Sequence, residues 1–508
     1  MRSTFTVAFT CVSFACLRAF SAQPDATAIT IYSSAAPGAI APDLYRPLPG
    51  NVASDGMAVP GYAVVRQDRT IRLDAARSSI KFSDVAALID PTTVTFASLT
   101  DPRTRVLEQS FQFDLVSTEK LLLKFVDRNI TVERAAADRL TSSSGILLSS
   151  VDGLVLKGSD GAIQSIRGYD AIRFPDLPGG LNTRPTLLWS IEARQAGEQR
   201  ARVTYQTSGI TWWSDYNLIL SDGKDANSGV IDLSAWVSIV NQSGATYPDA
   251  KLKLVAGDVN RAVAPAQAPG VTLSAQRATQ EANDGFKQKA FFEFHLYTLG
   301  RPTTLQNNST KQVELFDRAQ QVPAKQSLIY EGFASAFVPY EMGRIITDRS
   351  FGPESNKKVD VYLEFRNARQ YGLGIPLPAG RIRVSKLDPA DGSLEFIGED
   401  LIDHTAKDEP VRVRLGSAFD VVGERRQIDF AVDSKAKWLE EEFEIKIRNH
   451  KELPVEVRVR EPLYRAAAWK VVSNSAEFRK DDGQNISFMV RVARDGEQAV
   501  RYRVRYTW

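Results

Sequence analysis

Apolar and polar residues alternate with a period of two along much of this 508-residue chain. Clear examples are residues 359–366 (VDVYLEFR), 443–448 (FEIKIR), 455–460 (VEVRVR) and 502–508 (YRVRYTW). Successive side chains of a β-strand point to opposite faces, so this spacing gathers apolar side chains on one face. It predicts antiparallel strands with one buried face and one solvated face.

Three of the predicted strands end on an asparagine, namely Asn241, Asn367 and Asn449. Asparagine tolerates left-handed backbone and hydrogen-bonds within its own turn, which suits a corner between strands. No fixed repeat period accompanies these corners, so they favour sandwiches over a propeller. The predicted fold is therefore mainly β, with multiple antiparallel β-sandwich domains of immunoglobulin-like type and few helices. Residues 117–126 are the best candidate for a short helix.

The first residues have the features of a secretory signal peptide. Arg2 gives a positive start, residues 5–17 are largely apolar, and residues 19–21 (AFS) form a small-x-small cleavage site. The two cysteines, Cys11 and Cys16, both lie in this leader, so we expect a mature protein without thiols or disulfides. Lipidation of Cys16 is the alternative, but the leucine usual three residues ahead is missing. We predict an exported protein, periplasmic or secreted.

The charge balance argues against a nucleic-acid partner. The chain has 63 Lys and Arg against 61 Asp and Glu, and two of the basic residues, Arg2 and Arg18, belong to the leader. Binding to a phosphate backbone requires a surplus of basic side chains, which this balance does not provide. After the leader, no apolar run reaches the length of a membrane helix, so no transmembrane span is predicted.

No strong catalytic motif occurs in the sequence. The nucleophile elbow, the phosphate-binding loop and the His-Glu-x-x-His zinc motif are all missing. The most suggestive polar cluster spans residues 399–409, where close carboxylates would bind a divalent cation or act as acid and base on a glycosidic bond. The alternative is a solvated loop between strands. We predict no cofactor and no metal, assign no catalytic residue, and keep as candidates Glu399, Asp400, Asp403, His404 and Glu409.

Two adjacent tryptophans, Trp212 and Trp213, stand out among the aromatic residues. Neighbouring side chains on one strand point to opposite faces, so the two rings cannot both face one core. Many sandwich domains hold sugar rings on exposed aromatic side chains, although core packing explains most aromatic residues equally well. Both tryptophans are therefore candidates for ligand contact.

Several longer strings resemble a known family. They are residues 90–94 (DPTTV), 108–115 (EQSFQFDL), 207–212 (TSGITW), 241–250 (NQSGATYPDA), 256–261 (AGDVNR) and 373–380 (LGIPLPAG). These strings resemble bacterial proteins related to mucoidy inhibitor A, whose shared domain is known as domain of unknown function 4139. No sustained heptad is present, so the chain resembles the shorter form without a coiled coil. The resemblance implies no catalytic residues.

These observations predict a division of the chain into successive parts. Two segments lack periodicity: the turn-rich amino end, and an Ala/Gln/Pro-rich stretch after residue 260. In chain order we predict a signal peptide (1–21), a loosely ordered N-terminal segment (22–56), an N-terminal β domain (57–190), the first part of the family β domain (191–260), a flexible insertion (261–288), a central β domain (289–430) and a C-terminal β-sandwich domain (431–508).

The predicted function is that of an exported cell-envelope protein without catalytic activity, which binds an unknown envelope protein or polysaccharide. Two alternatives stay open. The first is a carbohydrate-active hydrolase that uses the acidic cluster at residues 399–409. The second is a structural assembly subunit whose last strand pairs with the sheet edge of a partner.

Overall fold

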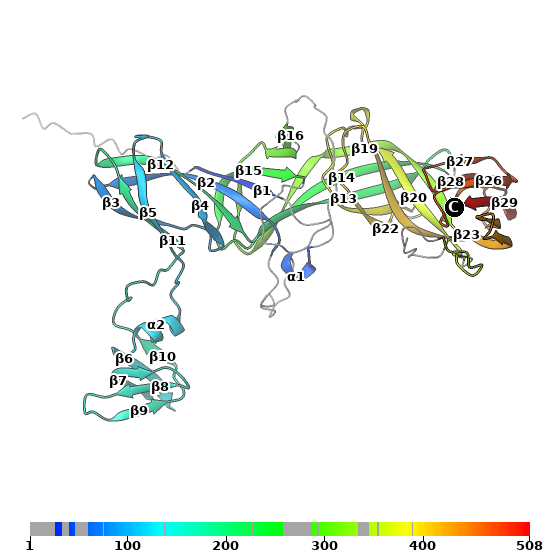
Figure 1. Cartoon of the computed structure of the whole chain (residues 1–508). Helices are drawn as coiled ribbons and strands as arrows, with labels where there is room; N and C mark the ends of the chain where they lie inside the picture. The colour runs from blue at the N-terminus through cyan, green and yellow to red at the C-terminus, as the bar shows by residue number, and fades with distance from the viewer. Residues whose placement is uncertain are drawn as a thin grey trace, which may run out of the picture. The chain divides into compact units, whose positions relative to one another are not determined.

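The computed structural model describes residues 26–32, 40–45, 59–74, 76–136, 139–225, 227–257, 286–291, 294–333, 345–352, 355–388 and 390–508. The predicted signal peptide (1–21) lies outside these residues, as do most of the N-terminal segment (22–56) and of the insertion (261–288). The described residues form 29 strands, two α-helices and one 3-10 helix (Figure 1). The prediction of a mainly β protein with few helices is confirmed, while the immunoglobulin-like sandwich type stays a prediction.

Two compact units make up the chain, and their segments interleave in the sequence. Unit 1 consists of Met1–Thr27, Arg66–Val85 and Pro91–Tyr205, and unit 2 of Ala28–Val65, Ala86–Asp90 and Gln206–Trp508. Strands β2 (Tyr62–Leu73), β4 (Ile89–Ser98) and β12 (Gly197–Ser208) therefore each contain residues of both units. The predicted boundaries between β domains stay predictions.

An eight-stranded sheet has the order β16-β17-β15-β1-β2-β12-β4, with β18 also paired to β15. Residues 26–32, which lie in the segment predicted to be loosely ordered, form β1 and pair in parallel with β15. Ile29 and Ile31 of β1 are fully buried, and this burial holds the segment in place. Besides β2, β4 and β12, this sheet contains β1 (Ala26–Tyr32), β15 (Tyr247–Ala256), β16 (Phe286–Phe291), β17 (Phe294–Leu299) and β18 (Thr303–Leu305).

Unit 1 also contains a three-stranded antiparallel sheet and a small inserted domain. The sheet has the order β3-β11-β5, from Arg77–Ser83, Thr186–Glu192 and Arg105–Gln112. The inserted domain has a five-stranded antiparallel sheet, β10-β6-β7-β8-β9, and the helix α2 (Thr118–Lys124), which confirms the predicted short helix. Its strands are β6 (Asn129–Ala136), β7 (Arg139–Ser149), β8 (Leu154–Lys157), β9 (Ile163–Ile166) and β10 (Ala171–Arg173).

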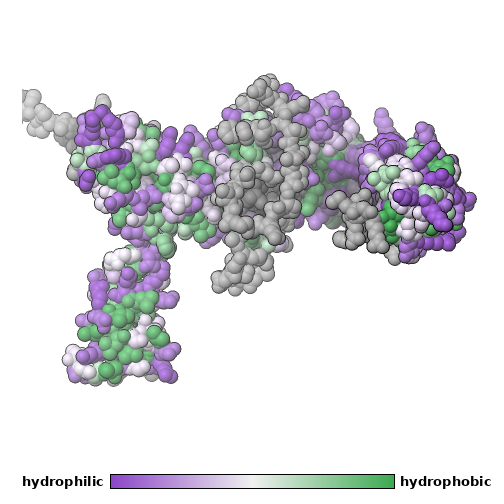
Figure 2. Space-filling model, in the orientation of Figure 1, coloured by the Kyte–Doolittle hydropathy of each residue, from purple (hydrophilic) through white to green (hydrophobic). Residues whose placement is uncertain are grey.

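Helix α2 begins at a capped serine and covers one face of the inserted sheet. The Ser117 hydroxyl accepts a hydrogen bond from the Lys120 N–H at 3.3 Å, an N-cap interaction that satisfies a free donor of the first turn. Leu122 and Phe125 are buried against Ile130 and Leu147 of the sheet. Apolar residues also appear on the surface of this domain in Figure 2. Its side chains Leu123, Val151 and Ile163 are each at least 63% exposed.

Unit 2 is built around a 13-stranded sheet with the order β22-β21-β13-β14-β19-β20-β23-β24-β29-β26. Strand β25 pairs with β19 and β28, and β27 pairs with β28. The bounds are β13 (Ile210–Asp222), β14 (Ser228–Asn241), β19 (Ser309–Glu331), β20 (Lys358–Arg366), β21 (Gly380–Leu387), β22 (Leu394–Ile402), β23 (Pro410–Asp433), β24 (Trp438–Asn449), β25 (Val455–Pro462), β26 (Trp469–Asn474), β27 (Phe478–Lys480), β28 (Asn485–Val492) and β29 (Gly496–Thr507). The helices are α1 (Pro42–Tyr45) and the 3-10 helix η1 (Arg369–Tyr371).

The three corner asparagines have the same role in the structure. Each is buried, and the side-chain amide of each donates hydrogen bonds to backbone carbonyls of nearby loops: Asn367, for example, donates to Ile375 O at 2.7 Å and to Ala406 O at 3.0 Å. Asn241 and Asn449 also accept the N–H two residues ahead, as predicted for a turn. Their backbones are not left-handed, because the amide group rather than the backbone angle fixes each corner.

Candidate functional site

The structure places the predicted acidic cluster on β22 and on the loop that follows it. Glu399 and Asp400 belong to β22, while Asp403, His404 and Glu409 lie exposed before β23. The Asp400 carboxylate accepts the backbone N–H groups of Arg414 at 2.6 Å and Leu401 at 2.9 Å. The Ala379 N–H donates to His404 Nδ1 at 3.0 Å. Among the residues that the structure describes, no three His, Cys, Asp or Glu side chains gather to hold a metal ion.

The two adjacent tryptophans lie on opposite faces of β13. Trp212 is 1% exposed and packs edge-on against Tyr297 in the interior. Trp213 is half-buried on the other face, and its indole Nε1 donates to the Asp215 carboxylate at 2.7 Å. Of the two predicted contact residues, only Trp213 lines a cavity, which is described below.

Strand pairing builds a polar patch around Trp213. On β13, Trp213 lies opposite Ser238 of β14, and Asp215 lies opposite Trp236 of β14 and Arg381 of β21. Residues directly opposite one another share a face of the sheet, as do residues two apart on a strand. We call this patch the tryptophan face, defined by Trp213, Asp215, Trp236, Ser238, Gln312, Arg381 and Arg383.

Asp215 is the centre of a chain of hydrogen bonds on the tryptophan face. Its side chain is largely buried, and its carboxylate accepts from Trp213 Nε1 and, at 3.0 Å, from the Ser238 hydroxyl. Gln312 Nε2 in turn donates to the Ser238 oxygen at 3.1 Å, and Arg383 lies 3.4 Å from Asp215 on the other side. These contacts fix the orientation of the carboxylate and of the indole ring before any ligand arrives.

A small cavity of about 140 Å³ opens on the tryptophan face. The Tyr45 ring of α1 is tilted against the Trp213 ring, with centroids 5.3 Å apart, and forms one wall. Arg381 is half-buried and makes no side-chain hydrogen bond or ion pair with any described residue. Trp236, 38% exposed, lies diagonally from Trp213. The lining residues are Ile40, Tyr45, Trp213, Asp215, Ser238, Thr310, Gln312, Arg381 and Arg383.

Arg383 joins the two sets of residues that the sequence singled out. Its guanidinium lies between Asp215 of the tryptophan face and Glu399 of the acidic cluster, with Nε 3.6 Å from Glu399 Oε2. Sequence reasoning missed Asp215, Arg381 and Arg383 as site residues. The alternation along β13 places Asp215 on the same face as Trp213, but the parallel pairing of β13 with β21 joins residues 168 positions apart, which no local pattern shows.

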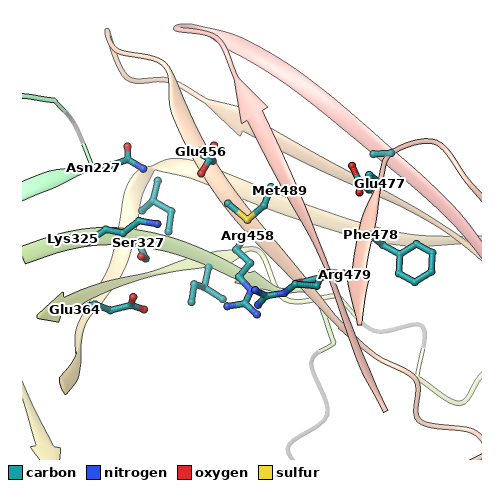
Figure 3. Close-up of a pocket in the computed structure, with 14 residues that line it drawn as sticks. Asn227, Lys325, Ser327, Glu364, Glu456, Arg458, Glu477, Phe478, Arg479 and Met489 are labelled. Atoms are coloured by element: carbon teal, nitrogen blue, oxygen red, sulfur yellow. The ribbon is translucent and has the colours of Figure 1, made fainter. Parts of the chain in front are cut away.

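A larger groove of about 580 Å³ lies elsewhere in unit 2, where β25 follows β14 along one edge of β19 (Figure 3). Charged side chains line it from several strands, and apolar side chains such as Leu328 and Met489 lie between them. The complete lining is Asn227, Lys325, Ser327, Leu328, Ile329, Glu364, Glu456, Arg458, Ala476, Glu477, Phe478, Arg479, Ser487 and Met489.

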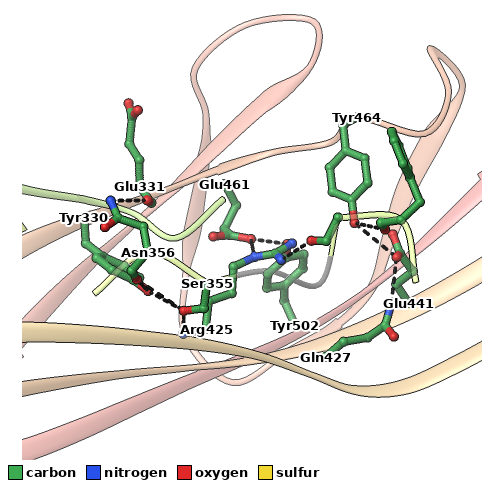
Figure 4. Close-up of polar contacts among 12 residues, drawn as sticks. Tyr330, Glu331, Ser355, Asn356, Arg425, Gln427, Glu441, Glu461, Tyr464 and Tyr502 are labelled. Carbon is green, nitrogen blue, oxygen red and sulfur yellow. Dashed lines mark hydrogen bonds and ion pairs between the residues drawn. The ribbon is translucent and has the colours of Figure 1, made fainter. Parts of the chain in front are cut away.

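The core of the carboxyl-terminal strands contains two fully buried ion pairs, Arg425 with Glu461 and Arg465 with Glu441. Figure 4 shows the first of them. Arg425 Nε lies 2.8 Å from Glu461 Oε2, and the same oxygen accepts the Tyr502 hydroxyl at 2.7 Å. The Arg425 guanidinium also lies over the Phe443 ring, 3.6 Å from its centroid. The Tyr502 hydroxyl and the Phe443 ring take the place of water around these two charges, which makes the ion pair tolerable in an apolar core.

The second pair, Arg465 with Glu441, fastens residues 345–352 to this core. Arg465 donates to the backbone carbonyls of Ile346, Asp348 and Phe351 at 2.6 to 2.8 Å, and Nη2 lies 2.7 Å from Glu441 Oε1. The Tyr464 hydroxyl donates to the same glutamate oxygen at 3.2 Å, and burial raises the pKa of Tyr464 to about 12. Each residue of this network bonds to other protein groups, but Glu441 Oε2 and Arg465 Nε are buried without a hydrogen-bond partner.

The described residues thus form a multi-sheet β protein with a small cavity and a larger groove in unit 2. Residues 201–508 match the family model described as Domain of unknown function (DUF4139), so the chain belongs to that family. The match includes the tryptophan face and the groove, but not the strings at residues 90–94 and 108–115, and the finer resemblance to mucoidy inhibitor A stays a prediction. No curated protein and no solved structure matches the chain. None of the described helices has the length and apolar character needed to cross a membrane.

Proposed function

We propose that this chain is an exported, non-catalytic binding protein of the bacterial cell envelope, and that its tryptophan face binds a polysaccharide. The observation that supports this most is that two tryptophans neighbour the oriented Asp215 carboxylate on one face: Trp213 two residues along β13, and Trp236 directly opposite on β14. Diagonal neighbours on paired strands lie roughly 7–8 Å apart, a spacing that lets two rings contact one extended ligand.

The chemistry of the tryptophan face suits a sugar. An indole ring offers a flat apolar surface for the C–H groups of a pyranose, while Asp215, Gln312 and Arg381 offer acceptors and donors for its hydroxyls. The cavity of about 140 Å³ is smaller than the roughly 300–1,000 Å³ typical of sites that enclose a whole ligand. A chain that lies across the face and inserts one group fits this geometry better than an enclosed small molecule.

The arrangement supports binding rather than hydrolysis. A glycosidase needs two carboxyl groups that flank the scissile bond, one of them free to donate a proton. Asp215 is already hydrogen-bonded by Trp213 and Ser238, and Asp400 by two backbone N–H groups. Export rests on the predicted leader at residues 1–21.

The test is affinity electrophoresis of the protein, followed by calorimetry, with a panel of neutral and acidic polysaccharides. Trp236→Ala is expected to weaken binding of the preferred polysaccharide about tenfold or more, because buried aromatic contacts dominate such interfaces. Trp508→Ala is the matched control, since Trp508 is similarly exposed at 42% but belongs to no cavity described here. Equal affinity of the two variants, or release of reducing ends from the polysaccharide, would contradict the proposal.

A further inference from the structure

We propose that the groove beside β19 binds an extended peptide segment of a partner protein, one that has an acidic side chain next to an apolar one. This site is separate from the tryptophan face and does not depend on the function proposed for it. Four observations support the inference: the way the groove forms, an arginine pair in it, the apolar side chains of its floor, and the charges of its rim.

The groove forms where two strands succeed one another along one edge of β19. Strand β14 pairs as far as Ser228 opposite Lys325, and the Gln326 N–H then donates to Asn227 O at 2.7 Å. Strand β25 begins to pair only at Leu328, and it runs parallel to β19. The opening between β14 and β25 is about 580 Å³, within the range of sites that hold a ligand.

Two arginines that line this opening, Arg458 and Arg479, contact the same carboxylate, that of Asp481. Arg458 Nη2 lies 2.8 Å from Asp481 Oδ2, and Arg479 Nε lies 2.9 Å from Asp481 Oδ1. Burial alone would raise the pKa of Asp481, but hydrogen bonds from Arg458, Ser487 and Arg479 hold it below its ordinary value. Asp481 is therefore ionised at neutral pH and balances one of the two guanidinium charges.

The remaining N–H groups of the pair are suited to bind a second carboxylate. Figure 3 shows the two guanidinium groups close together, and the side chains of Arg458 and Arg479 are 31% and 70% exposed. Planar guanidinium groups bind carboxylates through paired hydrogen bonds, which are stronger than neutral ones. Asp481 orients the pair in the empty protein, so a ligand carboxylate meets donors that are already in position.

The floor of the groove favours a peptide over a sugar. The apolar side chains that share a face with Arg458 are Ile329, which is buried, and Met489, which is 53% exposed. Methionine adapts its shape to varied apolar side chains, whereas sugar sites need a flat aromatic surface. The single aromatic ring of the lining, Phe478, points away from the charged groups in Figure 3.

The rim charges also favour an acidic ligand at the arginine pair. Two of the three rim glutamates, Glu364 and Glu456, are paired with Arg412 and Arg491, at 3.3 and 3.0 Å. The third, Glu477, is exposed and makes no ion pair with a described residue, but Figure 3 shows it apart from Arg458. Lys325 is exposed and makes no side-chain hydrogen bond or ion pair with a described residue, so its charge is available to a ligand. Electrostatic complementarity of this kind sets which partner docks and in which orientation.

The experiment uses fluorescence anisotropy with the full chain and a labelled short peptide of alternating aspartate and leucine. Peptides that alternate lysine with leucine, or aspartate with serine, test charge and apolar contact separately. We expect the aspartate–leucine peptide to bind best. Loss of one charge-assisted bond in Arg479→Gln should weaken it about tenfold or more, and Lys325→Gln should also weaken it. Arg494→Gln, on an exposed residue outside the groove, is the matched control.

Three outcomes would overturn the proposal. They are equal binding of the lysine peptide, equal binding of the aspartate–serine peptide, and affinity unchanged by both Arg479→Gln and Lys325→Gln. Tighter binding of a polyuronate, lost in the same variants, would assign the groove to an acidic polysaccharide instead. Trp236→Ala should leave peptide affinity unchanged, which separates a failure of this inference from a failure of the polysaccharide proposal.

Discussion

At the scale of single residues, two arginines and two glutamates are buried where a chain of this kind would place apolar side chains. Arg425 with Glu461 and Arg465 with Glu441 have no exposed side-chain surface. Desolvation of such charges is expensive, and a pair is tolerated only when its partners are in good geometry. Removal of one member leaves the other as an uncompensated buried charge.

Arg465→Met should therefore lower the free energy of unfolding by about 3–5 kcal/mol, since it leaves Glu441 charged and frees the carbonyls of residues 346, 348 and 351. Urea unfolding followed by circular dichroism measures this. Arg460→Met is the control: Arg460 pairs with Glu331 at the surface, where about 0–1 kcal/mol is expected. A similar small change in both variants would contradict the expected cost of leaving Glu441 without its partner.

Asp68 makes the stability of unit 1 depend on pH. The hydrogen bond from Arg202, assisted by the charges of Arg202, Arg66 and Arg200, lowers the pKa of this largely buried carboxyl. A lowered pKa in the folded state stabilises the fold above the ordinary Asp pKa of about 3.9, and this gain is lost as the pH falls through the folded value. Wild type should exceed Asp68→Asn in stability at neutral pH, and the difference should shrink only as the pH falls below about 4 and through the lower pKa of the folded state. A constant difference across an acid titration would contradict this.

At the scale of elements, a buried asparagine side chain stabilises each of three corners between strands. Asn241 ends β14, Asn367 follows β20, and Asn449 ends β24, and each donates to loop carbonyls. Replacement of the amide by a carboxylate removes both donors and places negative charge against carbonyl oxygens. The sequence indicated where these corners lie, but not that the side-chain amide would hold them.

Asn367→Asp should cost about 1–3 kcal/mol, because the partly buried Ile375 O would lose the Asn367 donor, while Ala406 O would keep only the longer hydrogen bond from the Glu409 N–H. Thermal unfolding at neutral pH measures the loss. Asn217→Asp, at an exposed position of β13, is the matched control and should change stability by less than about 0.5 kcal/mol. Equal melting temperatures of the two variants would sink this account of the corners.

The pairing of the last strand, β29, bears on the alternative that this protein is an assembly subunit whose last strand pairs with a partner's sheet. Strand β29 pairs with β24 along its whole length and with β26 between Tyr502 and Tyr506. Tyr502, Val504 and Tyr506 are buried in the core. A partner's strand would have to displace β26 in order to pair with this part of β29, so strand addition there competes with the fold itself.

At the scale of the whole molecule, the two segments that connect the inserted domain to the rest of unit 1 lie side by side. The Val116 N–H donates to Asn182 O at 3.0 Å, and the Asn182 N–H donates to Asp114 O at 2.9 Å. The domain has its own apolar core, formed by α2 and its five-stranded sheet. Domains with this kind of connection tolerate excision.

Replacement of residues 117–181 by a short glycine linker should leave the rest of the chain folded, with polysaccharide affinity unchanged within about twofold, because the tryptophan face belongs entirely to unit 2. Calorimetry and near-ultraviolet circular dichroism measure both properties. A control that removes residues 469–474 instead deletes β26 and should destabilise the carboxyl-terminal core. Loss of polysaccharide binding in the excision variant would tie the inserted domain to function.

The sequence by itself determined what depends on near neighbours. Alternation placed strands at residues 443–448, 455–460 and 502–507, and the helix formers within residues 117–126 indicated helix α2. It also established that Trp212 and Trp213 face opposite ways, since that follows from strand geometry alone. Only the tertiary structure decided which strands pair, and hence that Asp215 meets Arg383, that Arg458 meets Arg479 at Asp481, and that two units interleave. The reason is physical: a strand's two edges are equivalent backbone, so the partner is chosen by burial and fit across the whole sheet.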